Sequence, residues 1–392
     1  MVSFIQLVTG FAIAAGVAVA HPGEHHSNEH IRREIDVRDA HAAHGARALS
    51  QCANSATARR VKQRNVQRRV DKVQALRKER GINTNAKKFR RDLAALEEWE
   101  TVNHNYTGIT AYDMFTALET VFDANTSCIL APEVTAGPYY VQGEYFRSNV
   151  KEAEWSEGLD LFLEVQYVDI STCAPVPAVA VDIWNANATG VYSGISVSGN
   201  YAEDGVNSTY LRGIQLTDHE GVVSFETIFP GHYDGRATHT HLLAHTNASL
   251  LSNGTISVFN KPVAHIGQLF YPEELRSAVE ATSPYNTNTV DITSNDDDMW
   301  SIVQADSSYD PFPQFLYLGD DITDGLFAWI QIGINSTVDY QDDEYYAVAG
   351  YLAADGGHAE ANSLQSAGGG GGDAGGNGTA PSGTPPSSTA SA

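Results

Sequence analysis

The sequence predicts an all-β protein, a β-sandwich, with a helical N-terminal arm and a disordered C-terminal tail. Seven segments between residues 159 and 333 alternate in polarity or are rich in β-branched residues, and turn residues separate them. The balance of charge changes sign near residue 100, and the last forty residues are mostly Gly, Ala, Ser, Thr and Pro. Roughly 230 residues lie between these flanks, enough for one well-buried core.

Residues 1–20 form an apolar run that ends in Ala-Val-Ala, which is typical of a cleaved signal peptide. No other stretch is apolar enough to span a bilayer, so we expect a secreted, extracellular protein with no membrane partner. The Asn-x-Ser/Thr sequons fit export, and they include Asn105, Asn125, Asn207, Asn247, Asn253 and Asn335.

Residues 21–100 carry 18 Lys and Arg against 11 Asp and Glu, whereas residues 101–392 carry 6 against 37, for a net charge of −24. We therefore assign residues 21–104 as a separate basic helical arm or propeptide. Apolar residues at roughly helical spacing predict helices over about 48–80 and 85–104. A nucleic-acid patch is disfavoured because no aromatic residues are interleaved with the cations, so we expect no nucleic-acid partner.

The β domain is expected to span residues 105–352, with its site on loops and strand ends at one edge. Its predicted strands are 159–168, 178–184, 221–228, 237–244, 255–258, 263–270 and 326–333. Residues 353–392 have too little apolar surface to offset the entropy of ordering them, which predicts a disordered tail.

The chain has three cysteines. Cys128 and Cys173 both lie in the β domain, and in an oxidising compartment we expect them to form a disulfide. Cys52 would then be unpaired in the arm, or paired with another chain. No two cysteines have the spacing of zinc ligands.

The segment 229–241 ends in a His-Thr-His triplet. Side chains alternate across a strand, so His239 and His241 point to one face and could share a metal ion. Two such histidines are also common as packed or solvent-facing groups. Tyr233 and Arg236 lie just upstream, after a Pro-Gly turn signal. About forty residues earlier, a strand that carries Trp184 leads into a polar loop that delivers Tyr192.

In this order, the motifs resemble those of the intradiol ring-cleavage dioxygenases, specifically the secreted fungal branch. The shared parts are a tyrosine after Trp-x-x-Asn-x-x-Gly, a tyrosine after Pro-Gly, an arginine three residues later, and His-x-His. Residues 131–140 and 266–270 resemble two further segments of that family. The resemblance covers roughly residues 128–350.

The resemblance implies a non-haem Fe(III) centre held by Tyr192, Tyr233, His239 and His241. Ferric iron is a hard, highly charged ion, and two phenolates would offset most of its charge while two neutral imidazoles complete the set. The resemblance also implies that Tyr233 leaves the metal and accepts a catechol proton while Tyr192 stays. Arg236 would stabilise negative charge on the ring, and Gln268 would orient oxygen.

Four residues are expected to line the substrate pocket: Pro138, Tyr139, Tyr140 and Trp184. His232 and His245 flank the site and are not expected to be ligands. Two positions depart from the family pattern. Asn185 follows the tryptophan where His or Gln is more usual, and Asn187 lies in a sequon inside the loop that delivers Tyr192. We expect Asn187 to be folded in and unmodified.

The resemblance implies an extracellular enzyme that cleaves catechol-type rings with O₂ to ring-opened dicarboxylic acids. Its small-molecule partners would be an aromatic diol and O₂, and the sequence sets no oligomeric state. One alternative is a secreted wall-associated or binding protein that retains the fold without turnover. Another is a zinc hydrolase using His239 and His241, which would need a carboxylate ligand such as Asp234 and gives the tyrosines no role.

Overall fold

The computed structural model describes residues 27–82, 118, 122, 134–153, 156–196, 202, 204–252, 254–304, 310–343 and 345–360. The predicted signal peptide, the predicted helix over 85–104, Cys128 and most of the predicted tail lie outside these residues. Among the described helices, none combines the length and apolarity needed to cross a bilayer.

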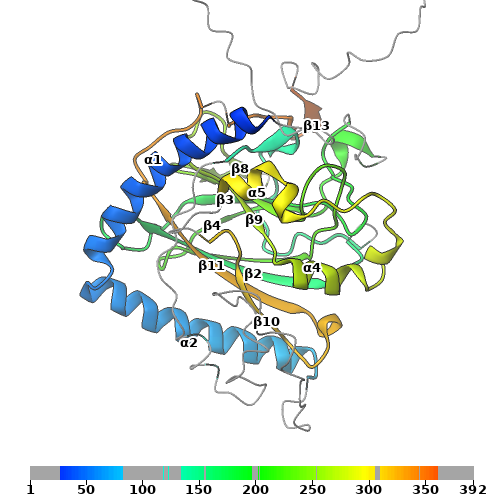
Figure 1. Cartoon of the computed structure of the whole chain (residues 1–392), viewed down its shortest axis with the longest axis horizontal. Coiled ribbons are helices and arrows are strands. Elements are labelled where there is room, and N and C mark those ends of the chain that lie inside the picture. Colours follow the sequence, from blue (N-terminus) through cyan, green and yellow to red (C-terminus); the bar gives the residue numbers. More distant parts are fainter. Residues whose placement is uncertain are drawn as a thin grey trace, which may run out of the picture.

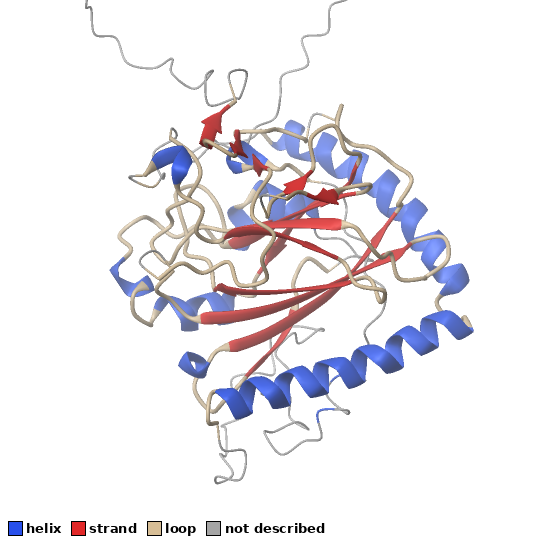
Figure 2. Cartoon of the chain, turned by 180° about the vertical axis from the view of Figure 1, so that it is seen from behind, coloured by secondary structure: helices blue, strands red, loops and turns tan. Residues whose placement is uncertain are grey.

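Two four-stranded sheets form the centre of the protein (Figures 1 and 2). The first has the order β10-β11-β2-β5, with β2 at Asp160–Asp169, β5 at Val222–Ile228, β10 at Gln314–Tyr317 and β11 at Leu326–Ile334. The second has the order β4-β3-β6-β9, with β3 at Ala180–Trp184, β4 at Arg212–Leu216, β6 at His239–His245 and β9 at Val263–Phe270. Only the β11–β2 pair is parallel in these two sheets.

One hydrophobic core joins the two sheets. It combines side chains of the first sheet, such as Val165 and Ile330, with side chains of the second, such as Val181 and Leu242. Strand side chains alternate between faces, so each sheet gives one face to this core. All seven predicted strands are confirmed, with ends that differ by at most two residues, and two sheets around one core match the predicted sandwich in outline.

Smaller elements surround the sandwich, and several were not predicted. Short strands are β1 (Val141–Gln142), β7 (Ser249–Leu250), β8 (Ile256–Ser257), β12 (Gly350–Ala353) and β13 (Gly356–Ala359). Helices α4 (Glu273–Glu280) and α5 (Met299–Gln304) follow β9, and 3₁₀ turns lie at Gly137–Tyr139, Gly205–Asn207, Tyr285–Thr287, Asn295–Asp297 and Ile322–Asp324. "All-β" is therefore too narrow a class, and β13 lies inside the range expected to be a disordered tail.

Two long helices form the arm: α1 (Asn28–Cys52) and α2 (Ala56–Glu79). The single helix predicted over 48–80 is wrong, because the first helix ends at Cys52. Ser55 then caps the second helix, since its side chain accepts from the Ala58 N–H. Figure 1 shows α1 and α2 wrapping two sides of the sheets.

Helix α2 packs against the outer face of the first sheet. Its apolar residues Val70, Val73 and Leu76 contact a cluster that includes Phe327 and Trp329. At the same face, the buried Arg69 Nε donates to Glu164 Oε1 at 2.7 Å. Burial alone would raise the pKa of Glu164, but the charges of Arg69 and Arg68 hold it below its ordinary value. The arm and the β domain therefore share a buried interface.

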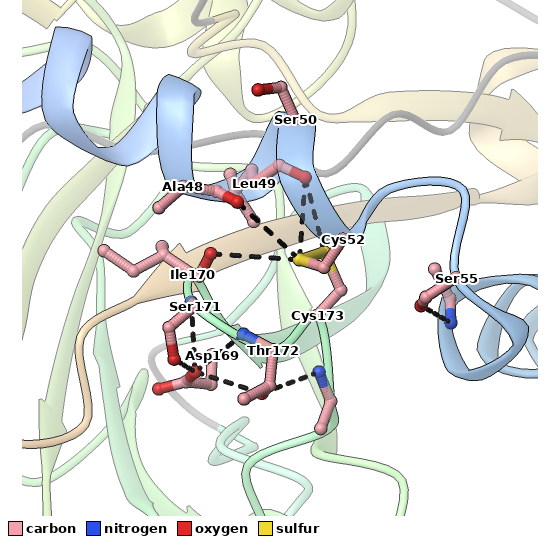
Figure 3. Close-up of a disulfide and its surroundings, with 12 residues drawn as sticks. Ala48, Leu49, Ser50, Cys52, Ser55, Asp169, Ile170, Ser171, Thr172 and Cys173 are labelled. Atoms are coloured by element: carbon pink, nitrogen blue, oxygen red, sulfur yellow. Dashed lines mark hydrogen bonds between the residues drawn. A yellow bond between two sulfur atoms is a disulfide. The ribbon is translucent and has the colours of Figure 1, made fainter.

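A disulfide joins Cys52, at the end of α1, to Cys173, in the turn after β2 (Figure 3). The Cα atoms are 5.7 Å apart, and Leu49 packs beside Ile170 in the same cluster. The predicted Cys128–Cys173 pair is wrong, because Cys173 is already bonded. The prediction treated the arm as a separate unit, whereas packing of α1 brings a distant cysteine to Cys173.

Candidate metal centre

The site lies on the outer face of the second sheet, opposite the shared core. Register pairs Trp184 with His241 and His241 with Gln268, so these three side chains stand side by side on neighbouring strands. A second hydrophobic cluster covers this face, with Val134, Ala136, Trp300 and Tyr345 among its members. Ile31 and Ile35 of α1 pack against the same cluster, so the arm also contributes to the cover.

Two loops bring the predicted tyrosines together by packing backbone against backbone. A Cβ at Gly190 would lie 2.3 Å from the His232 carbonyl, and one at Gly231 would lie 2.3 Å from the Ala188 carbonyl. Gly190 also has a φ of +83°, which a side chain rarely adopts. Only glycine fits both positions, and this close approach sets Tyr192 and Tyr233 with ring centroids 5.4 Å apart.

The loop that delivers Tyr192 is organised by Asn187. Its side-chain oxygen accepts from the backbone N–H of Thr189 at 3.0 Å and of Val191 at 2.9 Å, immediately before the tyrosine. Asn185 is buried and its oxygen accepts from the Thr227 hydroxyl, so it points away from the site toward the first sheet. Both departures from the family pattern therefore have structural roles here.

The two histidines present facing nitrogens. His239 Nδ1 lies 2.6 Å from the Ala237 carbonyl oxygen, which can only accept, so Nδ1 carries the proton and Nε2 has a lone pair. That Nε2 lies 3.0 Å from His241 Nε2 and 3.2 Å from the Tyr233 hydroxyl. Three predicted ligands thus converge on a common point.

Burial keeps both imidazoles neutral, which is the form that binds metals. Burial, with a smaller contribution from the positive charge of Arg236, lowers the pKa of His239 to about 3. Burial also lowers the pKa of His241 well below its ordinary value, with His239 and Arg236 adding to the effect. The two side chains therefore offer lone pairs throughout the physiological pH range.

The fourth predicted ligand, Tyr192, is completely buried beside Tyr233. Among the described residues, no group makes a well-formed hydrogen bond to its hydroxyl. Burial raises the pKa of both phenols. A buried polar atom without a partner is costly, and a bound cation would both satisfy it and favour the phenolate. The buried hydroxyl of Tyr192 therefore favours a metal-binding role for this residue over a role in packing alone.

The donor set of two phenols and two imidazoles fits ferric iron. Among the described residues, no group of three or more His, Cys, Asp and Glu side chains has the arrangement of a metal site. Asp234, the carboxylate that a zinc hydrolase would need, is exposed. The donors therefore disfavour the zinc alternative and also the two-His-one-carboxylate pattern of ferrous oxygenases.

Arg236 is buried and clamped on two sides. Its Nε donates to Asp298 Oδ2 at 2.8 Å, and its Nη2 donates to Gln268 Oε1 at 2.6 Å. The Gln268 amide nitrogen in turn donates to the Thr135 carbonyl at 2.8 Å. Both the oxygen and the nitrogen of the Gln268 amide are thus hydrogen-bonded, and within the site its partner is Arg236.

Aromatic rings pack around the four donors. Tyr139 stacks on Tyr192 with centroids 4.4 Å apart, and Trp184 stacks on His241 at 4.6 Å with ring planes 4° apart. Pro138 lies in the 3₁₀ turn that carries Tyr139. The Tyr140 hydroxyl instead contacts His245 Nε2 at 2.8 Å and Asp182 Oδ2 at 3.1 Å, and only its ring reaches Trp184. His245 is therefore hydrogen-bonded to Tyr140, and His232 Nδ1 lies 2.7 Å from Glu280 Oε1, so both histidines have partners outside the four donors.

Two residues near the site were not found from the sequence. Asp298 binds Arg236, but nothing in the run Asn-Asp-Asp-Asp distinguishes one acid from its neighbours. Arg212 donates to the Ser193 carbonyl from Nε at 3.0 Å and from Nη2 at 2.6 Å, which holds the backbone just after Tyr192. The scarcity of basic residues in the β domain was a usable signal for Arg212.

Comparison with known proteins gives the following matches. A family model described as "Dioxygenase" matches residues 135–252. A solved structure of an intradiol ring-cleavage dioxygenase from Tetranychus urticae is 31% identical, with 54% of this chain and 97% of that chain covered and a TM-score of 0.44. The dioxygenase domain of a carbohydrate-binding fusion from Streptomyces sp. SirexAA-E is 21% identical, with 52% and 97% covered and a TM-score of 0.33. Catechol 1,2-dioxygenase from Acinetobacter sp. ADP1 is 18% identical, with 54% and 66% covered and a TM-score of 0.34. None of the curated proteins matches the sequence.

Proposed function

Because this chain belongs to the intradiol ring-cleavage dioxygenase family, we propose that it is an extracellular non-haem Fe(III) enzyme that opens catechol-type rings with O₂ to dicarboxylic acids. The observation that carries the iron proposal is the convergence of two buried phenols and two neutral imidazoles, with an orphaned Tyr192 hydroxyl among them. The extracellular location rests on the signal-peptide pattern of residues 1–20.

The four residues that would hold the iron are Tyr192, Tyr233, His239 and His241. Bound ferric iron would supply a Lewis acid that activates the catechol ring toward oxygen. The Ala237 carbonyl fixes the tautomer of His239, and the stacked indole of Trp184 fixes the plane of His241. These contacts preset the direction of both imidazole lone pairs.

The two tyrosines have different surroundings, which supports a division of roles. Tyr192 is stacked under Tyr139, and its loop is anchored by Asn187 and Arg212, so it is suited to remain in place. Tyr233 lies at a tight turn that closes on Arg236, and its hydroxyl is bonded to His239. We assign Tyr233 as the group that accepts a substrate proton at its phenolic oxygen.

Arg236 supplies a fixed positive charge close to the donors. Burial alone would lower its pKa, but Asp298 and the neighbouring phenols raise it above its ordinary value, so the guanidinium stays charged. In a buried site such a charge stabilises negative charge that develops on the substrate ring. The surrounding aromatic residues exclude water, which strengthens this interaction.

The test is oxygen uptake with product identification on a panel of catechols, using iron-loaded wild-type protein. We expect ring-opened dicarboxylic acids, and an Arg236→Ala variant that keeps its iron but turns over roughly 10²-fold more slowly. Arg80→Ala is the matched control, because Arg80 pairs with Asp160 at the surface, away from the donors. The enzymatic proposal would be refuted if folded, iron-loaded wild-type protein consumed no oxygen with any catechol. That result would favour a binding protein that retains the fold.

A further inference from the structure

Asp298 is a buried carboxylate, 1% exposed, whose only role described above is to keep Arg236 charged. It lies at the start of α5, far along the chain from every predicted site residue. Its Oδ2 accepts from Arg236 Nε at 2.8 Å and from the Ala237 backbone N–H at 2.7 Å. One carboxylate oxygen therefore binds both the arginine and the residue that follows it.

The other oxygen of Asp298 connects this point to a helix. Oδ1 accepts from the backbone N–H of Trp300 at 2.8 Å and of Ser301 at 3.1 Å, in the manner of an N-cap. Trp300 in turn packs edge-on against Tyr345 at 5.8 Å, and the Tyr345 hydroxyl donates to Glu34 of α1. Asp298 thus connects Arg236 to the first turn of α5, and α5 in turn contacts the arm through Tyr345.

An arginine side chain has several rotatable bonds, so an unrestrained guanidinium would sample many positions. Here Asp298 holds Nε from one side and Gln268 holds Nη2 from the other. Nη1 is part of neither bond. Two anchors at different nitrogens fix both the position and the plane of the group.

We propose that Asp298 is a positioning residue for the reaction, acting through Arg236. Its carboxylate sets the guanidinium in the orientation that stabilises charge on the substrate ring. The inference rests on the proposed function. It extends the site beyond the metal ligands to the segment between β9 and β10, which the sequence motifs do not include.

The experiment is a double-mutant cycle on the full-length, iron-loaded protein: wild type, Asp298→Ala, Arg236→Ala and the double variant. Asp298→Ala should keep its iron and the visible charge-transfer absorption of iron-bound phenolates. It should lower kcat by roughly 10- to 100-fold with KM changed much less, because a small misplacement of a charge-stabilising group slows the reaction strongly. In the Arg236→Ala background, loss of Asp298 should lower kcat by less than about 3-fold, because residues that act through one another are not additive.

Two further variants separate positioning from folding. Asp298→Asn keeps the size and one acceptor oxygen, so it should fold if Asp298→Ala does not, and it should lie between wild type and Asp298→Ala in kcat. Asp321→Ala is the matched control, because Asp321 also caps a short helix but is exposed and has no contact with Arg236. It should leave kcat unchanged.

Equal losses of kcat in the wild-type and Arg236→Ala backgrounds would overturn the proposal, as would loss of iron in Asp298→Asn. Unchanged kinetics in both Asp298 variants would overturn it too. These outcomes are distinct from failure of the proposed function, in which the wild-type protein itself turns over no catechol.

Discussion

Removal of the Cys52–Cys173 disulfide should destabilise the protein strongly, because the bond closes a long loop. The two cysteines are separated by 121 residues in the sequence. In the chain-entropy description of cross-links, a loop of this length corresponds to about 5 kcal/mol of stabilisation, through loss of freedom in the unfolded chain. The double variant Cys52→Ser/Cys173→Ser should lose a stability of this order.

The loss converts to a change in melting temperature. For about 270 described residues, an unfolding entropy of roughly 2.1 cal/mol/K per residue gives about 0.6 kcal/mol/K, so 5 kcal/mol corresponds to about 9 °C. Thermal unfolding of the double variant and of Cys128→Ser, each beside wild type, measures it. Cys128→Ser should not show this loss, because the disulfide partner of Cys173 is Cys52.

Non-reducing peptide mapping identifies the pair directly. We expect one cross-linked peptide pair that contains Cys52 and Cys173. A pair that joins Cys128 to Cys173, or a large loss of stability in Cys128→Ser with none in Cys52→Ser, would refute the reasoning and restore the pairing expected from the sequence.

Three further results are expected. Glu164→Gln should cost about 3 kcal/mol or more in chemical unfolding, since it leaves the buried Arg69 without its partner, whereas Arg64→Gln should cost under about 1 kcal/mol because that side chain is half-exposed. Burial raises the pKa of Glu144 from 4.5 to about 7. Between these pH values the folded state binds a proton that the unfolded state does not, so the free energy of unfolding falls as pH rises from 4.5 through about 7, by at most about 3 kcal/mol. Glu144→Gln should remove this contribution and flatten the pH dependence of stability. His241→Ala should lose iron by metal analysis while circular dichroism stays native, and retained iron would remove His241 from the ligand set.

The strands were predictable because their signal is local. Alternation and β-branched residues in β2, β3, β5, β6, β9 and β11 act within a few residues of each other, and tertiary contacts reinforce them. The break between α1 and α2 had a local signal too, the cap at Ser55, but helical spacing across it led to one long helix.

The proposed ligands came from the resemblance, whose motifs are local in the sequence, and strand alternation by itself indicated only that His239 and His241 share a face. What the sequence did not show is long-range. Cys52 reaches Cys173 only because α1 packs against the turn after β2, and Arg69 reaches Glu164 only because α2 covers the first sheet. Asp298 contacts Arg236 across 62 positions of sequence. Such contacts depend on the packing of whole elements, which residue spacing does not encode.

The central claim is that Tyr192, Tyr233, His239 and His241 bind ferric iron. The most direct measurement is a titration of the purified, metal-depleted protein with ferric iron, followed by visible absorption and metal analysis. We predict one iron per chain with a charge-transfer band from the phenolates, a band that fades on acidification as the ligands are protonated and that is altered or lost in Tyr192→Phe. A folded protein that takes up no ferric iron and stays colourless would contradict the account.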